Sequence, residues 1–141
     1  MATAFLSDTE TLIAASRKIG PADVGDKHTV FFSKTLAASG LATGDTIALC
    51  RLPAGARVLY GEFCWSATQG ATATTAIGIT GTAAKYMAAA VTASTAKFPF
   101  AATQALGYGA ALTADEVVIA TNAAAAWTAS SVLRGHIDYM L

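Results

Sequence analysis

The sequence predicts a single all-β domain, a β-sandwich or jelly roll of about eight short strands, preceded by an N-terminal arm. Segments rich in Thr, Val, Ile and aromatic residues recur at short intervals, and Gly, Pro, Asn or Asp separates them, which is typical of strands joined by turns. Alanine is abundant, but it is interleaved with Thr, Gly and Val rather than set in long helical periods. The length of 141 residues suits one domain with its own core. A small barrel would fit the same pattern.

Residues 1–26 differ from the rest and are predicted to form the arm. Residues 7–20 have a helix-like pattern that Ser7 or Asp8 could cap and that Gly20-Pro21 ends. We expect the arm to order on a neighbouring subunit, as segments that fold on binding do. The same residues could instead be a first element packed on the domain, which covers residues 27–141.

The strand signals begin at His28. The expected strands are residues 28–36, 46–52, 57–66, 74–80, 84–89, 97–101, 116–121 and 132–140. After the second of these, Pro53 and Gly55 predict a type I turn with Pro at its second position and Gly at its fourth.

The third strand has no clearly polar face. Alternation places Val58, Tyr60, Glu62 and Cys64 on one face, and Leu59, Gly61, Phe63 and Trp65 on the other. A strand that is apolar on both sides is central in its sheet or is buried again at a subunit contact.

Charge is scarce and balanced, with nine Lys and Arg against nine Asp and Glu and only 13% charged residues. Without a basic patch, neither nucleic acid nor an anionic membrane is an expected partner. A net charge near zero favours association, so we expect much of the surface to face other subunits. No apolar stretch is long enough to span a bilayer, and the first residues lack the pattern of a secretory signal.

No catalytic, cofactor or metal motif is found, so we expect no enzyme and no cofactor. His28 and His136 are the only histidines, and no metal-ligand spacing or phosphate-binding loop occurs. Cys50 and Cys64 lie in apolar strands and are predicted to be buried free thiols, since nothing indicates secretion. A disulfide, or a Cys–His pair formed in space, is the alternative.

Two carboxylates stand in apolar strands. Glu62 is either a catalytic carboxylate or, as we favour, the partner of Arg51, of Arg57 or of another subunit. Asp138 could pair with Arg134. The carboxylates expected in solvated turns or at loop edges are Asp23, Asp26, Asp45, Asp115 and Glu116. Lys85 and Tyr86 are expected at a strand edge, and the aromatics expected in the core or an interface are Phe31, Phe32, Phe63, Trp65, Phe98, Phe100 and Trp127.

Three segments together resemble small virion structural proteins of tailed bacteriophages. They are Leu-Pro-Ala-Gly-Ala-Arg-Val-Leu (residues 52–59), Thr-Thr-Ala-Ile-Gly-Ile-Thr-Gly (residues 74–81) and Leu-Arg-Gly-His-Ile-Asp-Tyr-Met (residues 133–140). The resemblance spans roughly residues 46–141 and consists of turn and strand patterns. It implies a capsid decoration, or cement, protein. Such a protein is often a homotrimer that binds the major capsid protein on the capsid surface of the virion after assembly in the host cytoplasm.

Three other functions fit the composition less well. One is a ring component of the phage tail or head–tail joint. Another is a carbohydrate-binding, adhesin-like domain, which would expose Trp65, Trp127, Tyr86 or Tyr108 for stacking on sugars. A hydrolase comes last, and would gather Glu62, Asp138 or His136 in a pocket with a second polar group.

Overall fold

The protein is an all-β sandwich of two antiparallel four-stranded sheets. The structure is a computed structural model that describes residues 27–38, 40–101 and 110–141. The predicted arm and its helix, residues 1–26, lie outside the described residues, so the arm stays a prediction. Within the described ranges no helix is long and apolar enough to cross a membrane.

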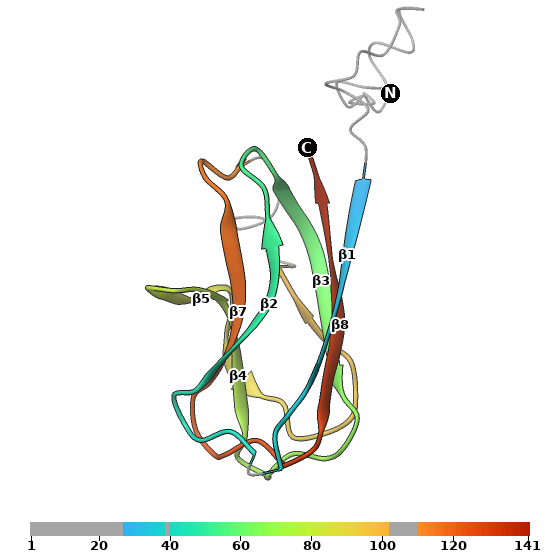
Figure 1. Ribbon diagram of the computed structural model, residues 1–141, viewed down its shortest axis with the longest axis vertical. Coiled ribbons are helices and arrows are strands. Elements are labelled where there is room, and N and C mark those ends of the chain that lie inside the picture. The colour runs from blue at the N-terminus through green and yellow to red at the C-terminus, as the bar shows by residue number, and fades with distance from the viewer. Residues whose placement is uncertain (1–26, 39, 102–109) are drawn as a thin grey trace, which may run out of the picture.

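Eight strands form the two sheets, in agreement with the predicted fold class (Figure 1). The first sheet has the order β1-β8-β3-β6 and the second the order β2-β7-β4-β5. The strands are β1 (Lys27–Thr35), β2 (Thr46–Leu52), β3 (Arg57–Trp65), β4 (Thr74–Ile79), β5 (Thr82–Val91), β6 (Phe98–Phe100), β7 (Glu116–Asn122) and β8 (Val132–Met140). Strands β2 and β8 have the predicted bounds, whereas β5 is longer and β6 shorter than predicted.

The turn between β2 and β3 is shifted by one residue from its predicted position. The Ala56 amide donates to the Pro53 carbonyl at 3.2 Å, so Pro53 takes the first position and Gly55 the third. Gly55 has a φ of 86°, which only glycine adopts without strain. The type I assignment was therefore wrong, because a positive φ at the third position belongs to type II geometry.

Strand β3 is central, between β8 and β6, as predicted. Its pairing with β8 shifts register between Val58 and Tyr60. This irregularity brings Val58, only 2% exposed, to the core side with Phe63 and Trp65. The simple alternation predicted for Val58 was wrong, because an extra residue in a strand reverses the side that its neighbours face.

Aromatic side chains fill the space between the sheets. The rings of Trp65 and Trp127 pack with their centroids 5.1 Å apart, and each residue is 1% exposed. The rings of Phe63 and Phe100 belong to the same core, and their centroids are 6.2 Å apart. The predicted core aromatics are buried or half-buried, with one exception: Phe31 is 77% exposed.

Candidate functional site

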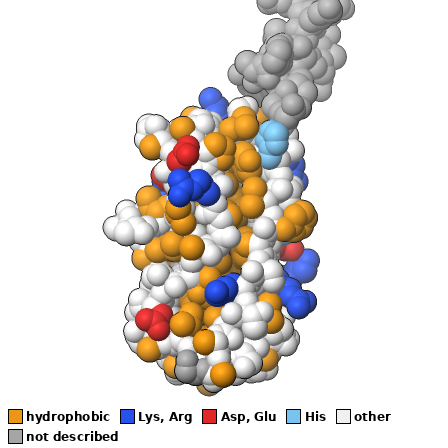
Figure 2. All heavy atoms as spheres, in the orientation of Figure 1, with side chains coloured by type: hydrophobic (Ala, Val, Ile, Leu, Met, Phe, Trp, Pro, Cys, Tyr) orange, Lys and Arg blue, Asp and Glu red, His pale blue; other side chains and the backbone are white. Residues whose placement is uncertain are grey.

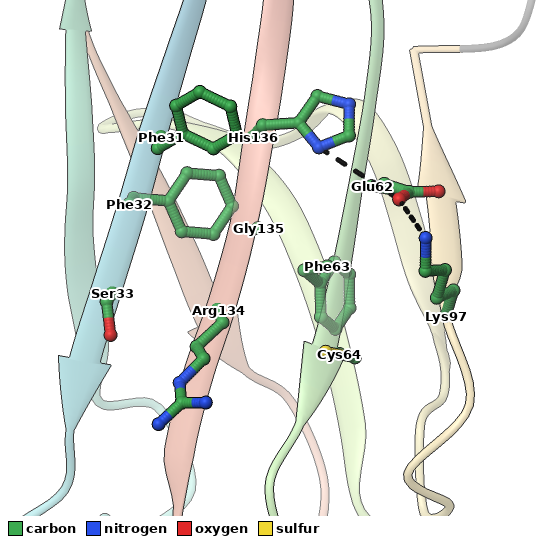
Figure 3. A pocket seen from close by; sticks show the side chains of 10 residues that line it. All are labelled: Phe31, Phe32, Ser33, Glu62, Phe63, Cys64, Lys97, Arg134, Gly135 and His136. Carbon is green, nitrogen blue, oxygen red and sulfur yellow. Dashed lines mark hydrogen bonds and ion pairs between the residues drawn. The ribbon is translucent and has the colours of Figure 1, made fainter.

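The outward face of the first sheet carries a groove lined by charged and aromatic side chains (Figure 3). In the sheet register, His136 of β8 stands between Phe31 of β1 and Glu62 of β3. Directly opposed residues share a face, so these three side chains lie on one side of the sheet. The cavity measures about 370 Å³, and its lining is completed by Phe32, Ser33, Phe63, Cys64, Lys97, Arg134 and Gly135.

Glu62 is the best-connected polar residue of the groove. Lys97 lies just before β6, and its Nζ is 2.7 Å from Glu62 Oε1; the Tyr60 hydroxyl donates to Glu62 Oε2 at 3.3 Å. The hydrogen bond from Lys97 is the main reason that the pKa of Glu62 lies below its ordinary value. His136 Nδ1 stands 4.0 Å from Glu62 Oε1, too far for a hydrogen bond.

The predicted pairing of Glu62 with Arg51 or Arg57 was wrong, whereas a contact with another subunit stays a prediction. Arg51 lies on β2, in the other sheet, and Arg57 lies at the far end of β3, opposite Met140. Lys97 takes their place because β6 pairs with β3 and sets Pro99 opposite Glu62.

The predicted pairing of Asp138 with Arg134 was also wrong. Four residues along one strand separate their Cα atoms by about 13 Å, whereas a residue directly across the ladder is near. Thr29 occupies that cross-strand position and donates to Asp138 Oδ1 at 2.7 Å, while Lys27 Nζ is 2.7 Å from Asp138 Oδ2. Burial tends to raise the pKa of Asp138, but these two contacts outweigh it and hold the pKa below its ordinary value.

Glu62 is not tuned as a general acid. A general acid at neutral pH needs a raised carboxyl pKa, and that of Glu62 is lowered. The structure does bring Glu62 and His136 together with Lys97, but Asp138 is engaged by Lys27 and Thr29. Across the described residues, no three His, Cys, Asp or Glu side chains are placed to hold a metal ion. The arrangement can bind and orient a partner by charge and packing.

Both cysteines are free thiols, as predicted, but they are half-buried rather than buried. They belong to different sheets, with Cys50 on β2 and Cys64 on β3 opposite Arg134. Burial raises the pKa of Cys50 to about 11.

A third ion pair joins the edge strand β5 to β7. Lys85 pairs with Glu116, and the Tyr86 hydroxyl donates to the same carboxylate at 2.8 Å. Burial is the main cause that raises the Tyr86 pKa, and the Glu116 contacts add to it. The edge position predicted for Lys85 is confirmed, whereas Glu116 is an ion-pair partner rather than a solvated turn residue.

The aromatics that would stack on sugars are not on the surface. Trp65 and Trp127 are each 1% exposed, and Tyr86 is 3% exposed. Tyr108 lies outside the described residues. Among the described residues the exposed Phe, Tyr or Trp side chain is instead Phe31, for which a place in the core or an interface was expected; its neighbour Phe32 is buried. Strand alternation could have indicated that one of the two rings is exposed, since consecutive strand residues face opposite sides of the sheet.

No family model and no curated protein sequence matches the chain. Solved structures do match its fold. A chain of the capsid asymmetric unit of cyanophage Pam1 superposes with a TM-score of 0.65 and 24% identity, over 83% of this chain and 86% of that one. A chain of the capsid of Ralstonia phage GP4 superposes with a TM-score of 0.68 and 20% identity, over 82% of this chain and 84% of that one. A chain of the acid-stable capsid of Helicobacter pylori bacteriophage KHP30 superposes with a TM-score of 0.55 and 16% identity, over 82% of this chain and 94% of that one. At these identities the likeness establishes a shared fold.

Proposed function

We propose that this chain is a structural protein of a tailed-phage virion. It binds the outer capsid shell as a homotrimer and bridges neighbouring capsid subunits, with the major capsid protein as its partner. The observation that carries the proposal is the shared sandwich. Three chains from phage capsid assemblies match at least 82% of this chain, and the match covers 84–94% of their own lengths. The neighbours are thus proteins of similar size and whole-chain fold.

The outward face of the second sheet supports an assembly role. Residues that face one another across β2, β7 and β4 form rows, and successive rows point alternately into the core and outward. The row of Ile47, Ala120 and Ile77 points into the core and is buried. The exposed or half-buried residues of the other side are mostly uncharged, namely Thr46, Ala48, Val117, Ile119 and Thr121, and Arg51, opposite Val117, is the charged residue among them. In the view of Figure 2, charged side chains are few and scattered among hydrophobic ones. Such surfaces suit contact with other subunits better than isolation in water.

A mechanical role also fits the polar groups. The described carboxylates that lie in strands are held by neighbouring cations or hydroxyl groups: Glu62 by Lys97, Asp138 by Lys27 and Thr29, and Glu116 by Lys85 and Tyr86. The contacts of Glu62 and Asp138 tie neighbouring segments of the first sheet together, and the Lys85–Glu116 pair links β5 to β7, which are not neighbours in the second sheet. A bridging protein needs such rigidity to resist the outward pressure of packaged DNA, and it needs no reaction centre.

The first experiment is the solution mass of the purified full chain by size-exclusion chromatography with light scattering. We expect a stable species of three chains of 14.3 kDa each. The mass should hold over a wide dilution series, because an obligate trimer does not dissociate at working concentrations. Rings of six or more chains would instead favour a tail or head–tail joint, and a monomer at every concentration would contradict the trimer.

A further inference from the structure

The groove on the first sheet combines an exposed aromatic ring with a cation that has no ion-pair partner among the described residues. Phe31 is 77% exposed, and its ring lies 5.9 Å from that of His136. Arg134 is exposed on the next row of the same face, opposite Ser33 and Cys64. Lys97 is neutralised by Glu62, so Arg134 supplies the free charge. A ligand that fits has an aromatic group beside acidic groups.

Residues 1–26 of the chain contain such a segment. Phe5 is the sole aromatic residue among them, and Asp8 and Glu10 follow it closely. Its apolar and acidic groups are complementary to the aromatic ring and the free cation of the groove. Arg17 and Lys18, the basic residues of this part of the chain, come well after the acidic segment.

The connection is long enough for the segment to reach the groove of its own chain. Residues 11–26 link Glu10 to the start of β1 at Lys27, and Phe31 lies about 13 Å further along that strand. Sixteen residues span about 22 Å as a flexible coil and about 24 Å as a helix. A short tether of this kind gives an effective concentration in the millimolar range, at which weak contacts suffice.

We propose that residues 5–10 dock in the groove of the same chain, where Asp8 and Glu10 pair with Arg134 and Phe5 packs beside Phe31. The groove is then an intramolecular receptor for an acidic-aromatic segment, in place of the neighbouring subunit on which the arm was expected to order. This inference goes beyond the capsid role and does not depend on it.

Cys64 lines the groove and serves as a reporter of docking. In the full chain, Cys50→Ser removes the other native thiol and Ser7→Cys places a thiol in the segment. Mild oxidation of this variant should form a disulfide between position 7 and Cys64 within one chain, as identified by peptide mapping of the monomer band. A disulfide found only between chains would overturn docking in the same chain, and so would the absence of this bond.

A charge-reversal cycle in the same background separates docking from random collision of the tether. Arg134→Glu alone, or Asp8→Lys with Glu10→Lys, should slow cross-linking by up to about fivefold, because an exposed ion pair is worth up to about 1 kcal/mol. All three changes together should restore the rate. The rate of Cys64 with a small neutral disulfide corrects for altered thiol reactivity, and far-UV circular dichroism checks folding. Equal corrected rates in all four charge combinations would overturn the proposal.

Discussion

A buried hydrogen bond between two threonines anchors the edge of the second sheet. Thr75 of β4 and Thr92, which follows β5, place their hydroxyl oxygens 2.7 Å apart, and both residues are 0% exposed. Replacing either one by Val removes one hydroxyl and leaves the other buried without its partner. We expect each single variant to lose about 1–3 kcal/mol of unfolding free energy, the cost of desolvating an unpaired polar group. This corresponds to a fall of roughly 3–12 °C in Tm for a chain of this length.

The double variant Thr75→Val with Thr92→Val should be more stable than the sum of the single changes implies. It leaves no unpaired hydroxyl, so its stability should return to within about 1 kcal/mol of the wild type. Urea unfolding at one fixed protein concentration gives all four free energies, and the cycle gives the coupling. A double variant that loses the full sum would refute the paired-hydroxyl reasoning.

Thr74 provides a matched control on the same strand. Its hydroxyl is buried without a hydrogen-bond partner among the described residues. Thr74→Val should therefore be neutral or stabilising by up to about 1 kcal/mol, since it removes a desolvated polar group of the same shape. A loss comparable to that of Thr75→Val would mean that the methyl-for-hydroxyl change itself is harmful in β4.

Three further predictions concern packing, reactivity and pH. Gly135→Ala should destabilise the fold by about 1–3 kcal/mol in urea unfolding, because its Cβ would lie 2.2 Å from the Glu62 carbonyl oxygen; Gly70→Ala, with its nearest contact at 3.9 Å, is the near-neutral control. Cys50, with its pKa raised to about 11, should resist iodoacetamide at pH 7.5 in the folded protein and react after unfolding, as mass spectrometry would detect. Lys27 and Thr29 hold the folded pKa of Asp138 below its ordinary value, so the stability it adds is present above about pH 4, the ordinary pKa of an Asp, and is lost as the pH falls through the folded pKa. Asp138→Asn should flatten this acid dependence, and an unchanged pH profile would contradict the role of Lys27.

The strand positions could be predicted from sequence because they depend on local information. The bounds of β2 and β8 follow from β-forming residues between turn signals. Gly55 indicates a turn after β2 even though the turn begins one residue later than predicted. The register shift near Val58 could not be predicted, because it depends on how β3 and β8 pair, and 66 residues lie between these strands.

The groove was harder to predict than the fold for the same reason. Glu62 was recognised as unusual, but its partner Lys97 belongs to the segment before β6, and no local pattern indicates that β6 pairs with β3. Asp138 was likewise recognised without its partner, because β1 and β8 come from opposite ends of the domain. The exposure of Phe31 followed from alternation with Phe32 and was missed because both rings were assigned to packing.

The central claim is that the chain binds and reinforces a phage capsid. The most direct measurement adds the purified protein to expanded, decoration-free capsids of the virus that encodes it, followed by sedimentation and heating. We expect saturable co-sedimentation at a fixed copy number that is a multiple of three, together with a higher temperature of capsid disruption. Failure to co-sediment, or binding that leaves the disruption temperature unchanged, would contradict it.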